Sequence, residues 1–258
     1  MSLTTTLFAA GLWVAWACLV RWLCRNPRGD LLTGVYYHVA RVYALLFHRL
    51  GRPGAIRGLE HVPREHPGGL IVIANHTAGV DPMLVQACLA WEPRWMMARD
   101  MMVPGLNWFW QWSGVIAVDR TGRDSASARE GIRHLRASKP LGIFPEGKIE
   151  RPAGVLLPVL PGVGFIIAKT RAAVLPVVIR GTPDVDPAWR SLWIPSRSSI
   201  EFLPIVRFPP EATPDQIVRE IEAIYDRATG WPRRERAQTP AQPPAQTSGQ
   251  AARRAPKR

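Results

Sequence analysis

The chain has 258 residues, 47% hydrophobic and 21% charged, so a largely disordered protein and a polytopic membrane protein are both excluded. Its 33 Lys and Arg residues outnumber its 20 Asp and Glu residues, which gives a net charge of +13. This excess favours an anionic partner: nucleic acid, an acidic lipid surface or a phosphorylated substrate. The three cysteines, Cys18, Cys24 and Cys88, form neither a disulfide framework nor a metal-ligand pattern, and we expect no metal.

Residues 1–50 are predicted to form a hydrophobic anchor followed by an amphipathic helix. Residues 3–20 carry no charge, and as a helix they would extend about 27 Å, which is marginal for crossing a bilayer. Arg21, Arg25 and Arg28 follow the apolar run, whereas a secretory signal peptide would place its basic residues before it. By the positive-inside tendency, these arginines place the rest of the chain on the cytoplasmic face of the inner (plasma) membrane.

The second helix of this segment, expected over residues 35–50, has two distinct faces. One face would carry Val35, Val39, Val42, Tyr43, Leu46 and Leu50, and the other would carry His38, Arg41, His48 and Arg49. Two interpretations of the apolar face stay open. It packs on the protein core, which the spacing alone favours, or it lies in the headgroup region of a membrane beside the anchor.

Residues 51–230 alternate short apolar runs with polar helical segments. This pattern predicts one α/β domain with a central, mostly parallel sheet flanked by helices. The expected strands are 69–74, 95–98, 115–118, 141–144, 174–179 and 200–206. The expected helices are 82–90, 123–137, 162–172 and 214–228, with Gly230 ending the last one.

Residues 231–258 are predicted to be a disordered basic tail rich in Pro, Ala and Gln. Seven Arg or Lys and one Glu give the tail a charge of +6, which leaves 13 − 6 = +7 for the rest of the chain. A solvated extension is the favoured interpretation, and an electrostatic tether to anionic lipid is the alternative. The tail arginines lack interleaved aromatic residues, so we expect no nucleic-acid partner.

The loop after the first expected strand carries the first candidate site. It reads Asn75-His76-Thr77-Ala78-Gly79-Val80-Asp81 and leads into Pro82. The Asp81 carboxylate can hold one imidazole nitrogen of His76 and leave the other as a general base. Alternatively, Asp81 caps the following helix and His76 is an ordinary loop histidine, and the spacing does not decide between these alternatives.

The loop after the expected strand 141–144 imitates a nucleotide-binding loop. Gly142, Gly147 and Lys148 fit G-x-x-x-x-G-K, but Ile149 stands where a Ser or Thr would hold magnesium, so nucleotide binding is excluded. The chain also has no G-x-S-x-G elbow, and no cysteine lies beside a histidine. A base without its own nucleophile implies direct attack by a substrate hydroxyl on a bound electrophile.

Three cations follow successive expected strands. Arg120 follows strand 115–118, while Lys148 and Arg151 follow strand 141–144. Each alone is more often a solvated surface charge, but together they suit a phosphate group.

Four blocks of the sequence resemble those of the glycerolipid acyltransferase family, which the lysophosphatidate acyltransferases typify. They are NHTAGVDP, GVIAVDRTGRD, FPEG and VLPVVI, within residues 69–180. The resemblance implies the glycerolipid acyltransferase fold, preceded by a membrane-binding helical segment. It also implies transfer of a fatty acyl chain from acyl-CoA or acyl carrier protein to the free hydroxyl of a lysophospholipid. The foremost acceptor is 1-acyl-sn-glycerol 3-phosphate, which gives phosphatidic acid.

The resemblance also assigns roles to individual residues. His76 is implied as the general base, and Asp81 as the residue that orients it. The implied phosphate-binding residues are Arg120, Glu146, Gly147, Lys148 and Arg151, and the implied supporting residues are Asn75, Phe144, Pro145 and Pro176. No organic cofactor is required, because the acyl thioester is itself a substrate.

The third block departs from the family pattern directly after FPEG. Lys148 and Ile149 stand where the family commonly has Thr and Arg, and Arg151 is the nearest arginine. This departure leaves glycerol 3-phosphate or a lyso-aminolipid as alternative acceptors. A basic peripheral protein that binds anionic lipid without catalysis is the alternative from a different functional class.

Overall fold

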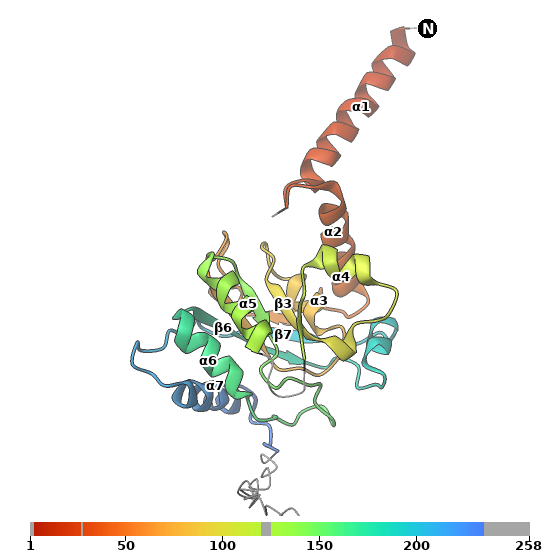
Figure 1. Ribbon diagram of the computed structural model, residues 1–258. Helices are drawn as coiled ribbons and strands as arrows, with labels where there is room; N and C mark the ends of the chain where they lie inside the picture. The colour runs from red at the N-terminus through yellow and green to blue at the C-terminus, as the bar shows by residue number, and fades with distance from the viewer. Residues whose placement is uncertain (1–2, 27, 120–124, 235–258) are drawn as a thin grey trace, which may run out of the picture.

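The computed structural model describes residues 3–26, 28–119 and 125–234 (Figure 1). The strands are β1 (Ile56–Arg57), β2 (Leu70–Ala74), β3 (Arg94–Ala98), β4 (Ile116–Val118), β5 (Leu141–Ile143), β6 (Ala173–Arg180) and β7 (Ser199–Phe202). The α-helices are α1 (Leu3–Leu23), α2 (Leu31–Leu46), α3 (Asp81–Gln86), α4 (Asn107–Ser113), α5 (Ser125–Arg136), α6 (Pro161–Thr170) and α7 (Pro214–Thr229). The 3-10 helices are η1 (Leu59–His61), η2 (Arg99–Met101) and η3 (Ala188–Trp193).

The strands of the described residues form one seven-stranded sheet in the order β1-β7-β6-β2-β5-β3-β4. All neighbouring strands are parallel except β6 and β7, which are antiparallel. Every residue of the central strand β2 is buried, as expected for a parallel strand covered on both faces. The mostly parallel α/β sheet predicted from the sequence is therefore confirmed.

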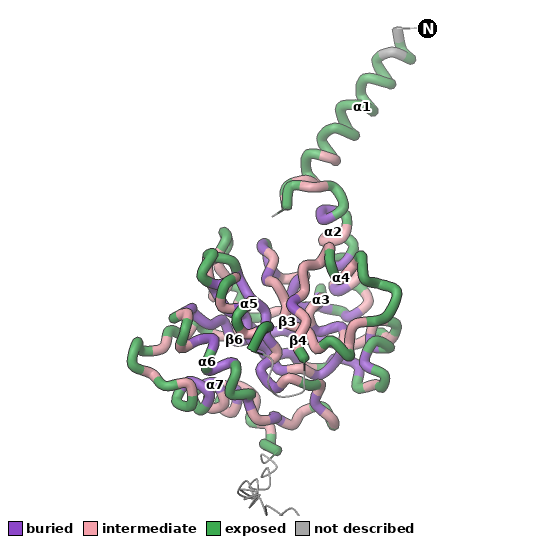
Figure 2. The backbone as a smooth tube through the Cα atoms, viewed as in Figure 1, coloured by how far each residue is buried: buried purple, intermediate pink, exposed green. Residues whose placement is uncertain are grey.

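The sheet separates two apolar clusters, because successive side chains of β2 point to opposite faces. Ile71 and Ile73 belong to the cluster that packs against α5, α6 and α7. Leu70 and Val72 belong to the cluster that includes residues of α2 and α3. Figure 2 shows buried backbone through the middle of the domain and exposed backbone along α1. The fold therefore has helices on both faces of the sheet, with the N-terminal helices on the α3 side.

Pro176 lies inside β6, although proline is rare in a central strand. Its carbonyl accepts a hydrogen bond from the Leu203 N–H, while the antiparallel ladder with β7 begins only at Val177. The missing proline N–H therefore falls directly before that ladder, where it interrupts no regular β6–β7 pair.

The N-terminal helices α1 and α2 are joined by a tight connection. Asp30 caps α2 by accepting a hydrogen bond from the Thr33 N–H. Gly34 sits against the end of α1, and a Cβ at this position would collide with the carbonyl oxygen of Leu23. From that contact α1 extends away from the domain (Figure 1). Within the described parts of the chain, no helix combines the length and the apolar character needed to cross a membrane.

Most of the apolar face of α2 does not pack on the core, although Tyr43 does, and this corrects the interpretation that spacing alone favoured. Val35, Val39, Val42 and Leu46 are 42%, 63%, 54% and 74% exposed, and we call these four residues the α2 ridge. The buried residues of α2 are instead small: Thr33, Gly34, Ala40 and Ala44. Small side chains let the helix lie close to the domain, so the ridge is left facing outward. Three other members of the expected faces lie beyond α2: Leu50 and His48 are buried, and Arg49 is exposed.

Other elements differ from the predictions at their ends. The sequence did not predict β1 or α4, and α4 is a short aromatic segment that ends at Gly114 in the left-handed region. The expected helix 82–90 is only the six-residue α3. The expected strand 200–206 stops at Phe202, although Val206 forms an isolated bridge with Val174.

The helix α7 closes the domain as predicted. Thr213 and Gln216 form a capping box at its start, and Gly230 ends it with a φ of 63°. The first residues assigned to the tail, 231–234, pack against the domain: Arg234 N–H donates to the Leu156 carbonyl, and Trp231 contacts the core cluster. The disorder predicted for the rest of the tail concerns residues 235–258, which lie outside the described residues.

Candidate active site

His76 and Asp81 meet at the carboxyl end of β2. The Nδ1 atom of His76 lies 2.9 Å from Oδ2 of Asp81, and the Asp81 side chain is fully buried. Because a carboxylate only accepts hydrogen bonds, the neutral imidazole carries its proton on Nδ1. The Nε2 atom is then left with a free lone pair, on a side chain that is 15% exposed. This is the arrangement of an oriented general base.

The structure decides between the two interpretations of Asp81. Its Oδ2 accepts hydrogen bonds from the Thr77 and Ala78 N–H groups at 2.7 and 2.8 Å, in addition to His76. Asp81 itself is the first residue of α3, and the N-cap residue Val80 makes no side-chain cap. The capping interpretation was therefore wrong, because the carboxylate turns back into the loop that precedes the helix.

Asn75 fixes the start of this loop to the neighbouring strand. Its side-chain amide donates to the Ile179 carbonyl at 3.0 Å and accepts from the Ile179 N–H at 2.8 Å, both on β6. The residue is fully buried, so both bonds form in an environment without competing water. Below them, the Tyr225 hydroxyl of α7 donates to the Ile73 carbonyl of β2.

Aromatic stacking connects β2 to the strands beside it. The His76 imidazole and the Phe144 ring stack with centroids 4.0 Å apart, and Phe144 also stacks with Trp95 at 5.0 Å. These residues come together because β2, β5 and β3 are neighbouring parallel strands. Gly142 makes room for the stack, since a Cβ there would lie within 2.8 Å of three atoms of the Trp95 indole.

Two buried carboxyl groups lie behind the His76 loop. Glu146 is 6% exposed, and Glu150 is fully buried with one oxygen accepting from the Val155 N–H. Burial, together with the like charges of Glu150 and Asp81, raises the pKa of Glu146 to about 9. Burial also raises the pKa of Glu150, to about 7. Glu146 is therefore protonated at neutral pH.

Arg151 ties the FPEG loop to the His76 loop. Its guanidinium donates to the carbonyls of Thr77 and Val185, at 2.7 and 2.9 Å, and forms an ion pair with Asp184 at 3.1 Å. The neighbouring Glu150 N–H donates to the His76 carbonyl. Arg151 thus holds the His76 loop in place, and its implied phosphate-binding role stays a prediction.

The other implied phosphate-binding residues differ in accessibility. Lys148 is exposed, and Gly147 adopts a φ of 69° in the turn beside it. Arg120 lies outside the described residues, so its phosphate-binding role stays a prediction. Pro145 is buried and its carbonyl accepts from the Leu160 N–H, which holds the FPEG turn against the start of α6.

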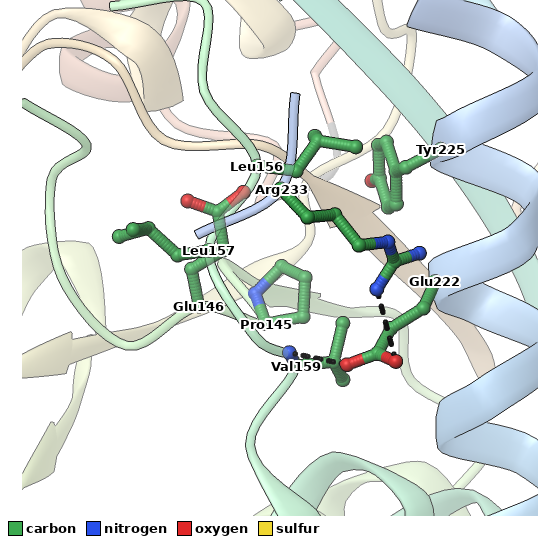
Figure 3. A pocket seen from close by; sticks show the side chains of 8 residues that line it. All are labelled: Pro145, Glu146, Leu156, Leu157, Val159, Glu222, Tyr225 and Arg233. Carbon is green, nitrogen blue, oxygen red and sulfur yellow. Dashed lines mark hydrogen bonds and ion pairs between the residues drawn. The ribbon is translucent and has the colours of Figure 1, made fainter. Parts of the chain in front are cut away.

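A small pocket opens behind the FPEG turn, between it and α7 (Figure 3). Its lining residues are Pro145, Glu146, Leu156, Leu157, Val159, Glu222, Tyr225 and Arg233. Within it, Arg233 pairs with Glu222 at 3.0 Å, and the Val159 N–H donates to the same carboxylate at 3.1 Å. These three residues thus form part of the pocket wall, and Glu146 lies in the same lining at 6% exposure.

Sequence reasoning missed several residues that shape the site. Trp95 supports Phe144, and Thr182 places its hydroxyl 2.5 Å from that of Thr77. Ser191 of η3 accepts from the Val80 N–H. No motif marks these positions. The strand order would have identified Trp95, because β3 lies beside β5 in the sheet.

Comparisons with known proteins show that the chain is similar to acyltransferases. Residues 55–180 match the acyltransferase family model. A 1-acyl-sn-glycerol-3-phosphate acyltransferase of Borreliella burgdorferi is 28% identical over 183 residues, which cover 66% of this chain and 72% of the relative. The crystal structure of the 1-acyl-sn-glycerophosphate acyltransferase PlsC from Thermotoga maritima matches with a TM-score of 0.62 at 23% identity. That match covers 86% of this chain and 88% of the other. It confirms the predicted fold.

Proposed function

We propose that this protein is a membrane-associated O-acyltransferase acting on a lysophospholipid, because residues 55–180 match the acyltransferase family model. The foremost acceptor is 1-acyl-sn-glycerol 3-phosphate, and the product is phosphatidic acid. The names of the similar proteins from Borreliella burgdorferi and Thermotoga maritima support this choice of acceptor. The observation that carries the proposal is the His76–Asp81 pair, with Nδ1 held at 2.9 Å and Nε2 left free.

The reaction needs one base and no covalent enzyme intermediate. His76 Nε2 takes the proton of the acceptor hydroxyl, and the oxygen forms a bond to the thioester carbonyl carbon. The tetrahedral intermediate then collapses with cleavage of the carbon–sulfur bond. The leaving thiolate takes the proton back from the imidazolium, whose charge the buried Asp81 carboxylate has stabilised. A positioned base contributes roughly 10²- to 10⁴-fold, and holding both substrates in line contributes most of the rest.

The acyl donor is acyl-CoA or acyl carrier protein, and the reaction uses no cofactor and no metal ion. We place the acceptor phosphate beside the FPEG turn, where Lys148 is exposed. Arg151 is the second basic residue of that loop, although its guanidinium already binds two carbonyls. Arg120 completes the proposed set.

The N-terminal helices supply the proposed membrane attachment, at the cytoplasmic face of the inner membrane. The α2 ridge is exposed, and so are Phe8, Trp13 and Trp16 of α1. Exposed apolar side chains in such number are typical of a surface that another apolar phase covers. Arg21 in the last turn of α1 and Arg25 just beyond the helix suit phosphate headgroups.

The test is acyl transfer by the purified protein in detergent, with long-chain acyl-CoA or acyl carrier protein as donor. The acceptor panel is lysophosphatidate, glycerol 3-phosphate and a lyso-aminolipid. We expect turnover with lysophosphatidate that is lost in His76→Ala, while that variant keeps its folded spectrum. Turnover with another panel member alone would reassign the acceptor. No turnover with either donor would favour a lipid-binding protein without catalysis.

A further inference from the structure

Two segments that are far apart in the chain pack along one side of α2, and each of them carries an exposed tryptophan. Trp108 of α4 is 62% exposed, and Trp193 at the end of η3 is 74% exposed. We call this pair the tryptophan flank. Exposing an apolar indole ring to water is unfavourable. Two exposed indoles near an apolar ridge therefore indicate a surface that another apolar medium covers.

The position of Trp108 follows from the contacts of its helix. The Tyr36 ring of α2 meets Trp112 edge-on at 5.0 Å and Phe109 at 6.2 Å. The Arg28 guanidinium lies 5.0 Å from the Trp112 ring. These contacts fix α4 against the first half of α2, and Figure 1 shows the two helices side by side.

Trp193 is held against the other half of α2. The Tyr43 hydroxyl donates to the Leu192 carbonyl, and the Ser196 N–H donates to the Phe47 carbonyl. Tyr36 and Tyr43 are two helical turns apart and therefore lie on the same side of α2. The segments that carry Trp108 and Trp193 thus pack along one side of α2, and that side adjoins the outward-facing α2 ridge.

We propose that the tryptophan flank is a second membrane contact, seated in the headgroup region of a phospholipid bilayer beside the α2 ridge. The inference rests on the proposed membrane association and adds to it a contact outside the N-terminal helices. Tryptophan suits this layer because its ring is apolar and its N–H still reaches water or lipid oxygen. Arg190 and Arg197, both exposed on either side of Trp193 in the chain, complement the lipid phosphates.

This contact would also position the catalytic loop. Ser191 of η3 accepts from the Val80 N–H at 3.1 Å, and Gly79 packs so closely on the Ala188 carbonyl that a Cβ would lie 2.7 Å from its oxygen. Seating Trp193 in the bilayer surface therefore holds the loop of His76 near the lipid headgroups. An acceptor that carries an acyl chain then reaches the base without leaving the bilayer.

The test measures tryptophan quenching in the full-length protein. The protein is reconstituted into vesicles of phosphatidylcholine and phosphatidylglycerol, with and without bromine on the acyl chains. Three variants, Trp108→Phe, Trp193→Phe and Trp231→Phe, are compared with the wild type, so that each difference spectrum isolates one indole. Trp231 is the control, because it packs on the cluster at the opposite face of the sheet.

We expect the Trp108 and Trp193 difference signals to lose at least half their intensity in brominated vesicles, and the Trp231 signal to stay unchanged. Unquenched Trp108 or Trp193 signals, with strong quenching of the total emission through α1, would overturn the second contact and keep the proposed membrane association. Unquenched total emission would overturn both.

A kinetic readout complements the spectra. The double variant Trp108→Ser, Trp193→Ser should raise the apparent KM for an acceptor presented in vesicles about tenfold. Phe165→Ser, which alters an exposed aromatic residue of α6 on the opposite face, should leave that KM within twofold. Equal values for the double variant and the wild type would contradict the proposal.

Discussion

The imidazole of His76 lies flat on the ring of Phe144, with centroids 4.0 Å apart and planes inclined by 20°. The hydrogen bond to Asp81 fixes the rotation of the imidazole within its plane, and the stacking fixes the plane itself. Two independent restraints therefore aim Nε2. Each can be removed separately, and their effects on turnover should differ in size.

Replacing Phe144 with Leu keeps an apolar side chain but removes the flat surface under the imidazole. Aromatic pairs are worth about 0.5–1.5 kcal/mol, so we expect kcat to fall about 2- to 12-fold with a smaller change in KM. Steady-state kinetics measures the split. Phe165→Leu on α6 is the control, and a larger change in KM than in kcat would contradict the positioning role.

Replacing Asp81 with Asn removes the charge that stabilises the imidazolium, while its amide oxygen can still accept from the Thr77 and Ala78 N–H groups. We expect kcat to fall by about 10²- to 10⁴-fold with little loss of stability. Activity assays and thermal unfolding together test this. The exposed Asp215→Asn of α7 should match the wild type, and a similar loss of activity there would refute the assignment.

Two glycine substitutions should change stability in opposite directions. Gly142→Ala places a Cβ within 2.8 Å of the Trp95 indole, so we expect about 1–3 kcal/mol of destabilisation and lower turnover through Phe144. Gly162→Ala on α6 has open space around its Cβ, and we expect about 0.5–1 kcal/mol of stabilisation. Urea denaturation of both variants checks the two signs.

Ionisation of Glu150 should make the free energy of unfolding depend on pH. Burial raises its pKa from 4.5 to about 7, so its contribution to stability is complete below pH 4.5 and is lost as the pH rises through about 7. Glu150→Gln cannot ionise and should be about 1–3 kcal/mol more stable than the wild type at pH 8, and equally stable at pH 4.5. Urea denaturation at both pH values tests this, with the exposed Glu211→Gln as control. Parallel pH curves for Glu150→Gln and the wild type would contradict it.

The sequence predicted the fold and the His76–Asp81 contact well, because both depend on local patterns. The buried run of β2 and the stop signal at Gly230 each determine structure within a few residues. The His76–Asp81 pair lies within one short loop, so its spacing already limited the geometry.

The supporting residues could not be predicted, because they depend on which strands lie side by side. Trp95 reaches Phe144 only through the order β2-β5-β3, and Thr182 reaches Thr77 only through the β2–β6 pairing. The hydrophobicity pattern also could not predict which face of α2 turns toward the domain. Its small residues Ala40 and Ala44 approach the domain closely, and a hydrophobicity pattern assigns the core to the larger side chains instead.

The close contact between Gly34 and the end of α1 controls the direction in which α1 leaves the domain. The 21 residues of α1 give it a length of about 31 Å, so a rotation of about 10° at the contact with Leu23 would displace its far end by about 5 Å. Any larger side chain at position 34 would push against the Leu23 carbonyl and change the angle between α1 and the domain. The tilt of the domain relative to α1 therefore depends on the close fit at Gly34 and on the stack of Trp22 against His38, whose ring centroids lie 3.8 Å apart.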